Sequence, residues 1–171
     1  IIFLTYLIIY VPKFDYIQGR ILSFFNRDSG THNFQSDKAI DSITSGGFFG
    51  KGIGEGTLKN RVPEAHTDYI ISVISEEFGV VAIMLILLLF LIFIYMVFKK
   101  ISFETDDRIK LILIGSISLI LMQATIHIGV NIRLFPTTGM TLPFLSYGGS
   151  SIISTSILAG IILNLTKRKI N

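Results

Sequence analysis

Four apolar segments constrain the fold of this chain more than any other feature of its sequence. They are Ile1–Val11, Val80–Phe98, Ile109–Ile132 and Tyr147–Leu165. The last three reach the roughly 20 residues that a helix needs to cross the hydrocarbon core of a bilayer. Lys110 is the only charged residue within these segments. The segments therefore predict an all-α polytopic membrane protein.

The composition agrees with a membrane protein and excludes several other classes. Hydrophobic residues make up 50% of the 171 residues, and charged residues make up 16%, below the roughly 25% of a typical soluble domain. The absence of cysteine excludes a disulfide scaffold and a Cys-based metal site. A net charge of +3 is too small to indicate a nucleic-acid partner.

The charges between the apolar segments predict how the chain crosses the membrane. Short basic loops beside membrane helices lie in the cytoplasm, which places Lys99–Arg108 and Lys167–Asn171 there. We read residues 1–171 as part of one transmembrane domain. Its predicted parts are a truncated membrane helix at 1–11, an extracytoplasmic loop at 12–68, membrane helices at 69–98, 109–132 and 147–166, and a re-entrant extracytoplasmic loop at 133–146.

The second half of the long loop carries a glycine-rich run. Gly46–Gly56 reads GGFFGKGIGEG, with apolar side chains between its glycines. This pattern predicts a backbone folded tightly against the membrane surface or the helix bundle, and a flexible turn region is the alternative. A Walker A nucleotide loop does not fit, because Gly52 rather than Ser or Thr follows Lys51.

Carboxylates precede the next membrane helix. Glu64 and Asp68 are spaced to share one helix face, and Asp68 falls at the extracytoplasmic mouth of the apolar segment. The structural alternative for Asp68 is a helix-start residue favoured by the helix dipole. Glu76 and Glu77 lie two turns deeper, where a carboxylate is costly and usually functional. The structural alternative is a salt bridge to Lys or Arg from a helix outside this chain.

Prolines and glycines interrupt the chain between the last two membrane helices. They are Pro136, Gly139, Pro143, Gly148 and Gly149. Irregular backbone near membrane depth persists only where it is buried in protein or lines a wet cavity, so we expect a cavity-lining segment. Arg133 and the nearby hydroxyls are candidates for binding an anion, and interfacial snorkelling is the alternative for Arg133. We interpret His127, in an apolar span, as a hydrogen-bonded packing residue.

Three stretches together resemble the SEDS family of bacterial polytopic membrane proteins. They are Ser45–Gly56 (SGGFFGKGIGEG), Pro63–Gly79 (PEAHTDYIISVISEEFG) and Phe135–Ser151 (FPTTGMTLPFLSYGGSS). The PEAHTD motif is more similar to the cell-division branch of this family than to the elongation branch. The resemblance implies ten transmembrane helices, so this chain would be a C-terminal fragment with the last four and a large extracytoplasmic loop.

The resemblance also implies an activity. SEDS proteins are peptidoglycan glycosyltransferases of the bacterial inner membrane, which polymerise lipid II, an undecaprenyl diphosphate-linked disaccharide pentapeptide. They work with a class B penicillin-binding protein, a transpeptidase, and with other division proteins. The essential aspartate of the family lies in an H-T-D stretch, which corresponds to Asp68, with Glu64 and His66 beside it. A fragment of this length is expected to be inactive alone.

The chemistry of that reaction suggests roles for further residues. The 4-hydroxyl of the acceptor sugar must lose a proton, which a positioned carboxylate such as Asp68 can accept as general base. The departing diphosphate needs cationic partners or a divalent ion, Mg²⁺ or Mn²⁺, although we predict no metal site made by protein ligands. The candidate substrate-binding residues are Glu64, His66, Lys51, Lys59, Arg61, Arg133, Thr138 and Ser146.

Two points remain open at this stage. Some family members carry Lys where this chain has Thr138, and we hypothesise that Arg133 supplies the missing charge. A flippase or transporter of the lipid-linked precursor would also use broken helices and intramembrane acids, and a division scaffold would bind partner proteins instead.

Overall fold

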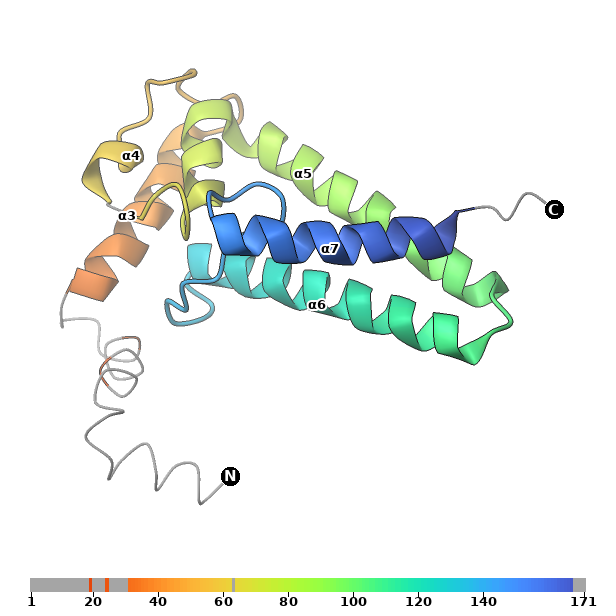
Figure 1. The fold of residues 1–171 in the computed structure, drawn as a ribbon. Coiled ribbons are helices and arrows are strands. Elements are labelled where there is room, and N and C mark those ends of the chain that lie inside the picture. The colour runs from red at the N-terminus through yellow and green to blue at the C-terminus, as the bar shows by residue number, and fades with distance from the viewer. Residues whose placement is uncertain (1–18, 20–23, 25–30, 63, 168–171) are drawn as a thin grey trace.

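The computed structural model describes residues 19, 24, 31–62 and 64–167, and every regular element in that part of the chain is a helix. The elements are α3 (Thr31–Gly46), α4 (Leu58–Arg61), α5 (Ile70–Phe103), α6 (Asp107–Asn131) and α7 (Gly149–Thr166). In Figure 1, α5, α6 and α7 run side by side, while α3 and α4 gather at one end of the bundle. The predicted span at 1–11 lies outside the described residues.

Three helices are long and apolar enough to cross a membrane, namely α5, α6 and α7. Their positions correspond to the last three predicted spans, which confirms a helical membrane protein. A core from all three holds them together: Leu113, Ile117 and Ile120 of α6 pack with Val97 of α5 and Ile162 of α7. The outward faces remain apolar and exposed, as expected of surfaces that contact lipid.

A second, smaller core holds α3 and α4 against the end of the bundle. Its buried side chains are Ala39, Leu58, Val62, Ala65, Tyr69, Val73 and Val130. These residues come from α3, α4, the turn before α5, the first part of α5 and the last turn of α6. The polar stretch between the predicted spans is therefore folded onto the bundle over its described residues.

Helix α5 is interrupted near its start. Gly79 has φ 78° and ψ −177°, which is not helical. In a continuous helix the amides of Val80 and Val81 would donate to the carbonyls of Glu76 and Glu77. The break removes both bonds and leaves two amides and two carbonyls that need other partners.

The glycine-rich run supplies all four of these partners. The amides of Lys51 and Gly52 donate to the two carbonyls at 2.9 and 3.0 Å. The carbonyls of Gly47 and Phe48 accept from the two amides at 3.0 and 3.4 Å. Two helical bonds are thus replaced by four bonds to Gly46–Gly56. The expectation of a tightly packed backbone is confirmed, and the flexible-turn alternative is wrong.

Glycine is required on both sides of this contact. A Cβ atom on Gly79 would lie 2.2 Å from the carbonyl oxygen of Phe48, and one on Gly50 would lie 2.2 Å from that of Glu77. Both glycines also have positive φ, at 78° each, a region that residues with side chains rarely adopt. The two backbones therefore approach more closely than any side chain would allow.

The break divides α5 into two parts with different lengths and surroundings. From Val80 to Phe98 the helix rises roughly 28 Å at 1.5 Å per residue, which matches the roughly 30 Å of bilayer hydrocarbon. The part before Gly79 is therefore not needed to cross the membrane. Glu76 and Glu77 belong to the shorter part before the break, and their depth in the membrane stays a prediction.

Candidate active site

Asp68 lies in a turn that directly precedes α5. The Asp68 amide donates to the carbonyl of Glu64 at 3.0 Å. The amide and hydroxyl of Thr67 donate to the same carbonyl at 3.2 and 3.1 Å. The Asp68 side chain is half-buried, and the helix begins two residues later at Ile70. The carboxylate is thus fixed to a compact turn at the mouth of a candidate membrane helix.

Three consecutive backbone carbonyls of this turn, those of residues 66–68, are bonded to the other side of the bundle. In chain order they accept from the amide of Tyr147 at 3.1 Å, the hydroxyl of Ser146 at 2.8 Å and the side-chain amide of Asn131 at 2.9 Å. Two of the donors belong to the α6–α7 connection, and the third is the last residue of α6. The backbone of Asp68 is therefore positioned from outside its own turn.

Asn131 makes more hydrogen bonds than the other two donors in the described structure. It is fully buried, and its Oδ1 accepts from the amide and the hydroxyl of Ser72 at 3.2 and 2.7 Å. Its Nδ2 donates to the carbonyls of Asp68 and His127, both at 2.9 Å. All four hydrogen-bonding positions of the amide are occupied. The sequence analysis did not single out Asn131, although a polar side chain at the end of an apolar segment is a signal of this kind.

The α6–α7 connection turns back along α6 before it enters α7. His127 Nδ1 lies 2.8 Å from the carbonyl oxygen of Met140, and Gln123 Nε2 donates to the carbonyl of Thr141 at 2.9 Å. Gln123 precedes the end of α6 by about two turns, so the connection follows the helix back for roughly 12 Å. The interpretation of His127 as a buried, hydrogen-bonded packing residue is confirmed.

This connection brings backbone close to the Asp68 carboxylate. A Cβ atom on Gly139 would lie 3.8 Å from Asp68 Oδ2, and Gly139 has φ 69°. Gly139 also lines a polar groove of about 300 Å³. The other lining residues of this polar groove are Gln123, Met140, Thr141, Gly148, Ser150, Ser151 and Ser154. The carboxylate therefore lies beside a groove rich in hydroxyl and amide groups.

An apolar groove lies on the other side of the same connection. It has a volume of about 320 Å³ and is lined by Ile86, Leu89, Phe90, Phe93, Pro143, Phe144 and Leu145. The first four residues belong to the crossing part of α5. Different residues of the α6–α7 connection thus line a polar groove and an apolar one.

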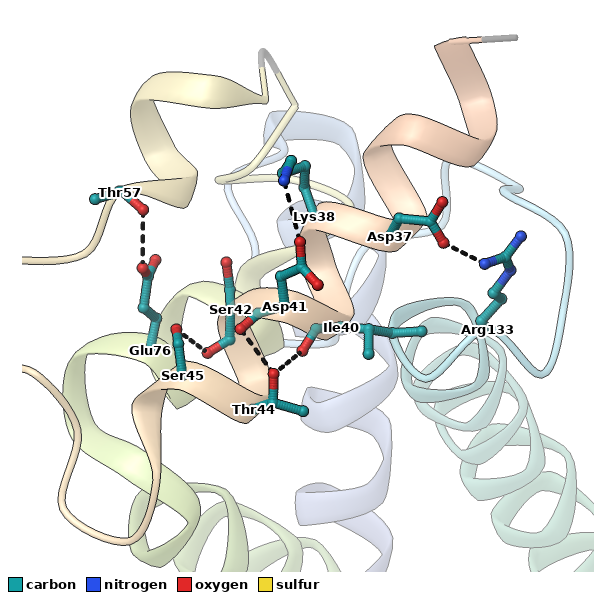
Figure 2. A network of polar contacts seen from close by, with 10 residues as sticks. All are labelled: Asp37, Lys38, Ile40, Asp41, Ser42, Thr44, Ser45, Thr57, Glu76 and Arg133. Atoms are coloured by element: carbon teal, nitrogen blue, oxygen red, sulfur yellow. Dashed lines mark hydrogen bonds and ion pairs between the residues drawn. The ribbon is translucent and has the colours of Figure 1, made fainter. Parts of the chain in front are cut away.

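Two of the predicted basic contacts line a cavity other than the two grooves. Lys51 and Arg61 line a separate cavity of about 260 Å³ between α3, the glycine-rich run, α4 and α5. Lys51 Nζ pairs with Glu76 Oε1 at 2.9 Å. Glu76 is 1% exposed and also accepts from the Thr57 hydroxyl at 3.1 Å, as Figure 2 shows, and from the Leu58 amide at 2.9 Å. The predicted pairing of Glu76 with a cation is confirmed, but its partner is Lys51 of this chain and not a residue from another helix.

The remaining predicted site residues occupy different surroundings. Arg133 forms an ion pair with Asp37 of α3 (Figure 2). Its backbone has φ 59°, and this pair ties the α6–α7 connection to α3. The side chains of Glu64, His66 and Thr138 are exposed, and Ser146 is buried. Lys59 belongs to α4, but its side chain lies outside the described part of the structure.

Together, the fold and this site define a class: a helical membrane protein with a carboxylate in the turn before a helix that continues into a candidate span, close to a polar groove. The chain belongs to the FtsW/RodA/SpoVE family of cell cycle proteins, because the model of that family matches residues 1–171. This result confirms the resemblance to the SEDS family.

Individual relatives agree with the family match. The chain is 38% identical over 158 residues to a probable peptidoglycan glycosyltransferase FtsW of Caulobacter vibrioides, covering 91% of this chain and 40% of the relative. Proteins with the same name from Geobacter metallireducens and Francisella salina are 36% and 39% identical over 96% of this chain, and 45% and 42% of their own lengths are covered. The chain thus spans less than half the length of these relatives.

Proposed function

We propose that the complete protein is a peptidoglycan glycosyltransferase that polymerises lipid II during cell division. Asp68 is its general base, and it acts on the extracytoplasmic side of the bacterial inner membrane. The observation that carries this proposal is the Asp68 carboxylate, held by its backbone at the mouth of α5 beside the polar groove. The names of the relatives support the same reaction class.

The proposed step transfers a glycan chain between two oxygens. The 4-hydroxyl oxygen of the acceptor sugar attacks the anomeric carbon of the donor, and its proton passes to the Asp68 carboxylate. The bond between the anomeric carbon and the diphosphate oxygen breaks as the new glycosidic bond forms. Undecaprenyl diphosphate leaves with the electron pair. The base must therefore reach a sugar hydroxyl while the lipid tail stays in hydrocarbon.

The two grooves suit the two halves of such a substrate. Sugar hydroxyls would pair with the amide and hydroxyl groups of the polar groove, and the polyisoprenyl chain would lie along the apolar groove. Gly139, which lines the polar groove, lies close to the Asp68 carboxylate. Three predicted contacts, Glu64, His66 and Thr138, have exposed polar side chains. Glu64 and His66 belong to the turn that carries Asp68.

The leaving diphosphate needs positive charge near the reacting carbon. Arg61 makes no ion pair in the described part of the chain, whereas Lys51 pairs with Glu76 and Arg133 pairs with Asp37. Lys51 and Arg133 would therefore bind phosphate by exchanging a carboxylate partner. The described residues contain no group of three or more His, Asp or Glu side chains arranged to hold a metal. A Mg²⁺ or Mn²⁺ ion would take most of its ligands from water and phosphate.

Polymerisation of lipid II by the full-length protein with its class B penicillin-binding protein tests the proposal. Loss of a general base lowers rates by about 10²- to 10⁴-fold, so Asp68→Asn should lower glycan synthesis by at least roughly 100-fold. Asp41→Asn, which changes an exposed carboxylate of α3, serves as the matched control. Wild-type synthesis by Asp68→Asn would remove Asp68 as the base.

The alternative functions are separated when lipid II movement and partner binding are measured beside polymerisation. The polymerisation assay also tests Arg133. Transbilayer movement of lipid II without glycan polymer would favour a flippase, and partner binding with neither activity would favour a scaffold. If Arg133 contacts diphosphate, Arg133→Lys should retain more activity than Arg133→Ala. Full activity in both variants would leave Arg133 with only its ion pair to Asp37.

A further inference from the structure

The tip of the glycine-rich run exposes three large apolar side chains. Phe48, Phe49 and Ile53 are 75%, 85% and 80% exposed. A flexible loop could fold such side chains inward, but this run is bonded to α5 through four backbone hydrogen bonds. Large apolar side chains exposed together on a bonded run indicate an interaction surface.

We propose that these three side chains form an interfacial anchor that inserts into the bilayer beside the first crossing turns of α5. The partner is the lipid surface itself, at the boundary between headgroups and acyl chains. This interaction surface is independent of the proposed glycosyltransferase activity. It follows from where the run is bonded to the helix and from which side chains surround it.

The hydrogen bonds fix the depth of the anchor. The amides of Val80 and Val81 donate to the carbonyls of Gly47 and Phe48 at 3.0 and 3.4 Å. Val80 is also where the part of α5 with the length of the hydrocarbon core begins. The anchor is thus held level with the membrane boundary, within a residue or two of the point where apolar helix enters lipid.

The surrounding surface continues the same apolar character into the membrane. Val81 and Met84, on the first crossing turns of α5, are 53% and 62% exposed, and Phe78 just before the break is 44% exposed. Side chains of this kind on a candidate membrane span contact acyl chains. The anchor therefore extends a lipid-facing surface outward by one loop.

The charged side chain of Lys51 points away from the apolar tip of the run. Lys51 sits between the apolar side chains in sequence, yet its ammonium pairs with the buried Glu76 carboxylate and lines the cavity with Arg61. The run thus turns the charge of Lys51 toward α3 and α5, while its exposed part carries the three apolar side chains and Glu55, a mixture found in segments that lie in a membrane interface.

Spin labelling of the full-length protein in nanodiscs tests the anchor. Nitroxides are placed at Phe49→Cys and Ile53→Cys in a background with any other cysteines replaced, in discs of phosphatidylethanolamine and phosphatidylglycerol. Collisions with oxygen, which concentrates in lipid, and with a water-soluble nickel chelate are then compared. Met84→Cys is the lipid reference and Glu55→Cys, exposed on the same run, is the water reference.

The anchor predicts an oxygen-to-nickel accessibility ratio at Phe49 and Ile53 severalfold above that at Glu55 and approaching that at Met84. A ratio equal to that at Glu55 would place the tip in water and overturn the proposal. Low accessibility to both reagents would also overturn it, because the tip would then be covered by protein. Both labelled positions are strongly exposed, so neither substitution threatens folding.

Discussion

The contact between the glycine-rich run and α5 depends on the absence of a side chain at Gly79, and Gly79→Ala tests that dependence. The new Cβ would lie 2.2 Å from the carbonyl oxygen of Phe48. That oxygen belongs to backbone and cannot rotate away as a side chain would. Alanine would also have to adopt φ 78° and ψ −177°, a conformation confined almost entirely to glycine.

The expected cost follows from these two effects. The strained backbone costs about 1–3 kcal/mol. Moving Phe48 away instead weakens the bonds from Val80 and Val81, at about 1 kcal/mol each. Moving Phe48 away from the new Cβ weakens these hydrogen bonds, and keeping the bonds retains the strain. We therefore expect Gly79→Ala to destabilise the closed contact by about 3 kcal/mol. This corresponds to roughly a 100-fold shift in the opening equilibrium.

Native-state hydrogen exchange of the full-length protein measures that equilibrium directly. The amides of Lys51 and Gly52, which donate to α5, should exchange roughly 100-fold faster in Gly79→Ala. Gly160→Ala in α7 is the matched control, because its Cβ would meet no atom within 4 Å and alanine favours a helix by about 0.5–1 kcal/mol. Protection of both amides at the wild-type level in Gly79→Ala would refute the reasoning.

Two further predictions concern buried polar groups. Asn131→Leu leaves the carbonyl of Asp68 and both donors of Ser72 without their partner; we expect a loss of about 2–4 kcal/mol in SDS-titration unfolding and at least a tenfold loss of glycan synthesis. Unchanged synthesis would show that Asn131 does not position the base. Lys51→Met leaves a 1% exposed carboxylate without its cation and should cost about 2 kcal/mol in the same titration, whereas Lys38→Met, whose partner is exposed, should cost under about 0.5 kcal/mol. Equal effects of the two Lys variants would contradict the buried pair.

Local sequence patterns predicted the features that depend on neighbouring residues. Uncharged apolar runs identified the three described candidate spans, because crossing hydrocarbon demands them. Glycines between apolar side chains predicted close backbone packing of Gly46–Gly56. Asp68 was singled out by its H-T-D stretch, which matches the SEDS family, and by its place directly before an apolar helix. Each of these inferences uses residues that lie within one segment of the chain.

The structure was needed wherever partners are distant in the sequence. Asn131 and Ser72 are 59 positions apart, and Arg133 and Asp37 are 96 apart, so no local pattern connects them. The break at Gly79 was missed because a single glycine inside an otherwise helical pattern is often tolerated in a continuous helix. The four hydrogen bonds that stabilise the break come from a run that ends well before α5 begins.

The three carbonyl bonds to residues 66–68 have a mechanical consequence. The turn that carries Asp68 lies outside the regular helices. Its position is fixed by hydrogen bonds from Ser146 and Tyr147 in the α6–α7 connection. Any force that displaces this connection, from a substrate pressing on the grooves or from a protein bound above them, is transmitted to the carboxylate. We therefore expect the Asp68 turn and the α6–α7 connection to move together.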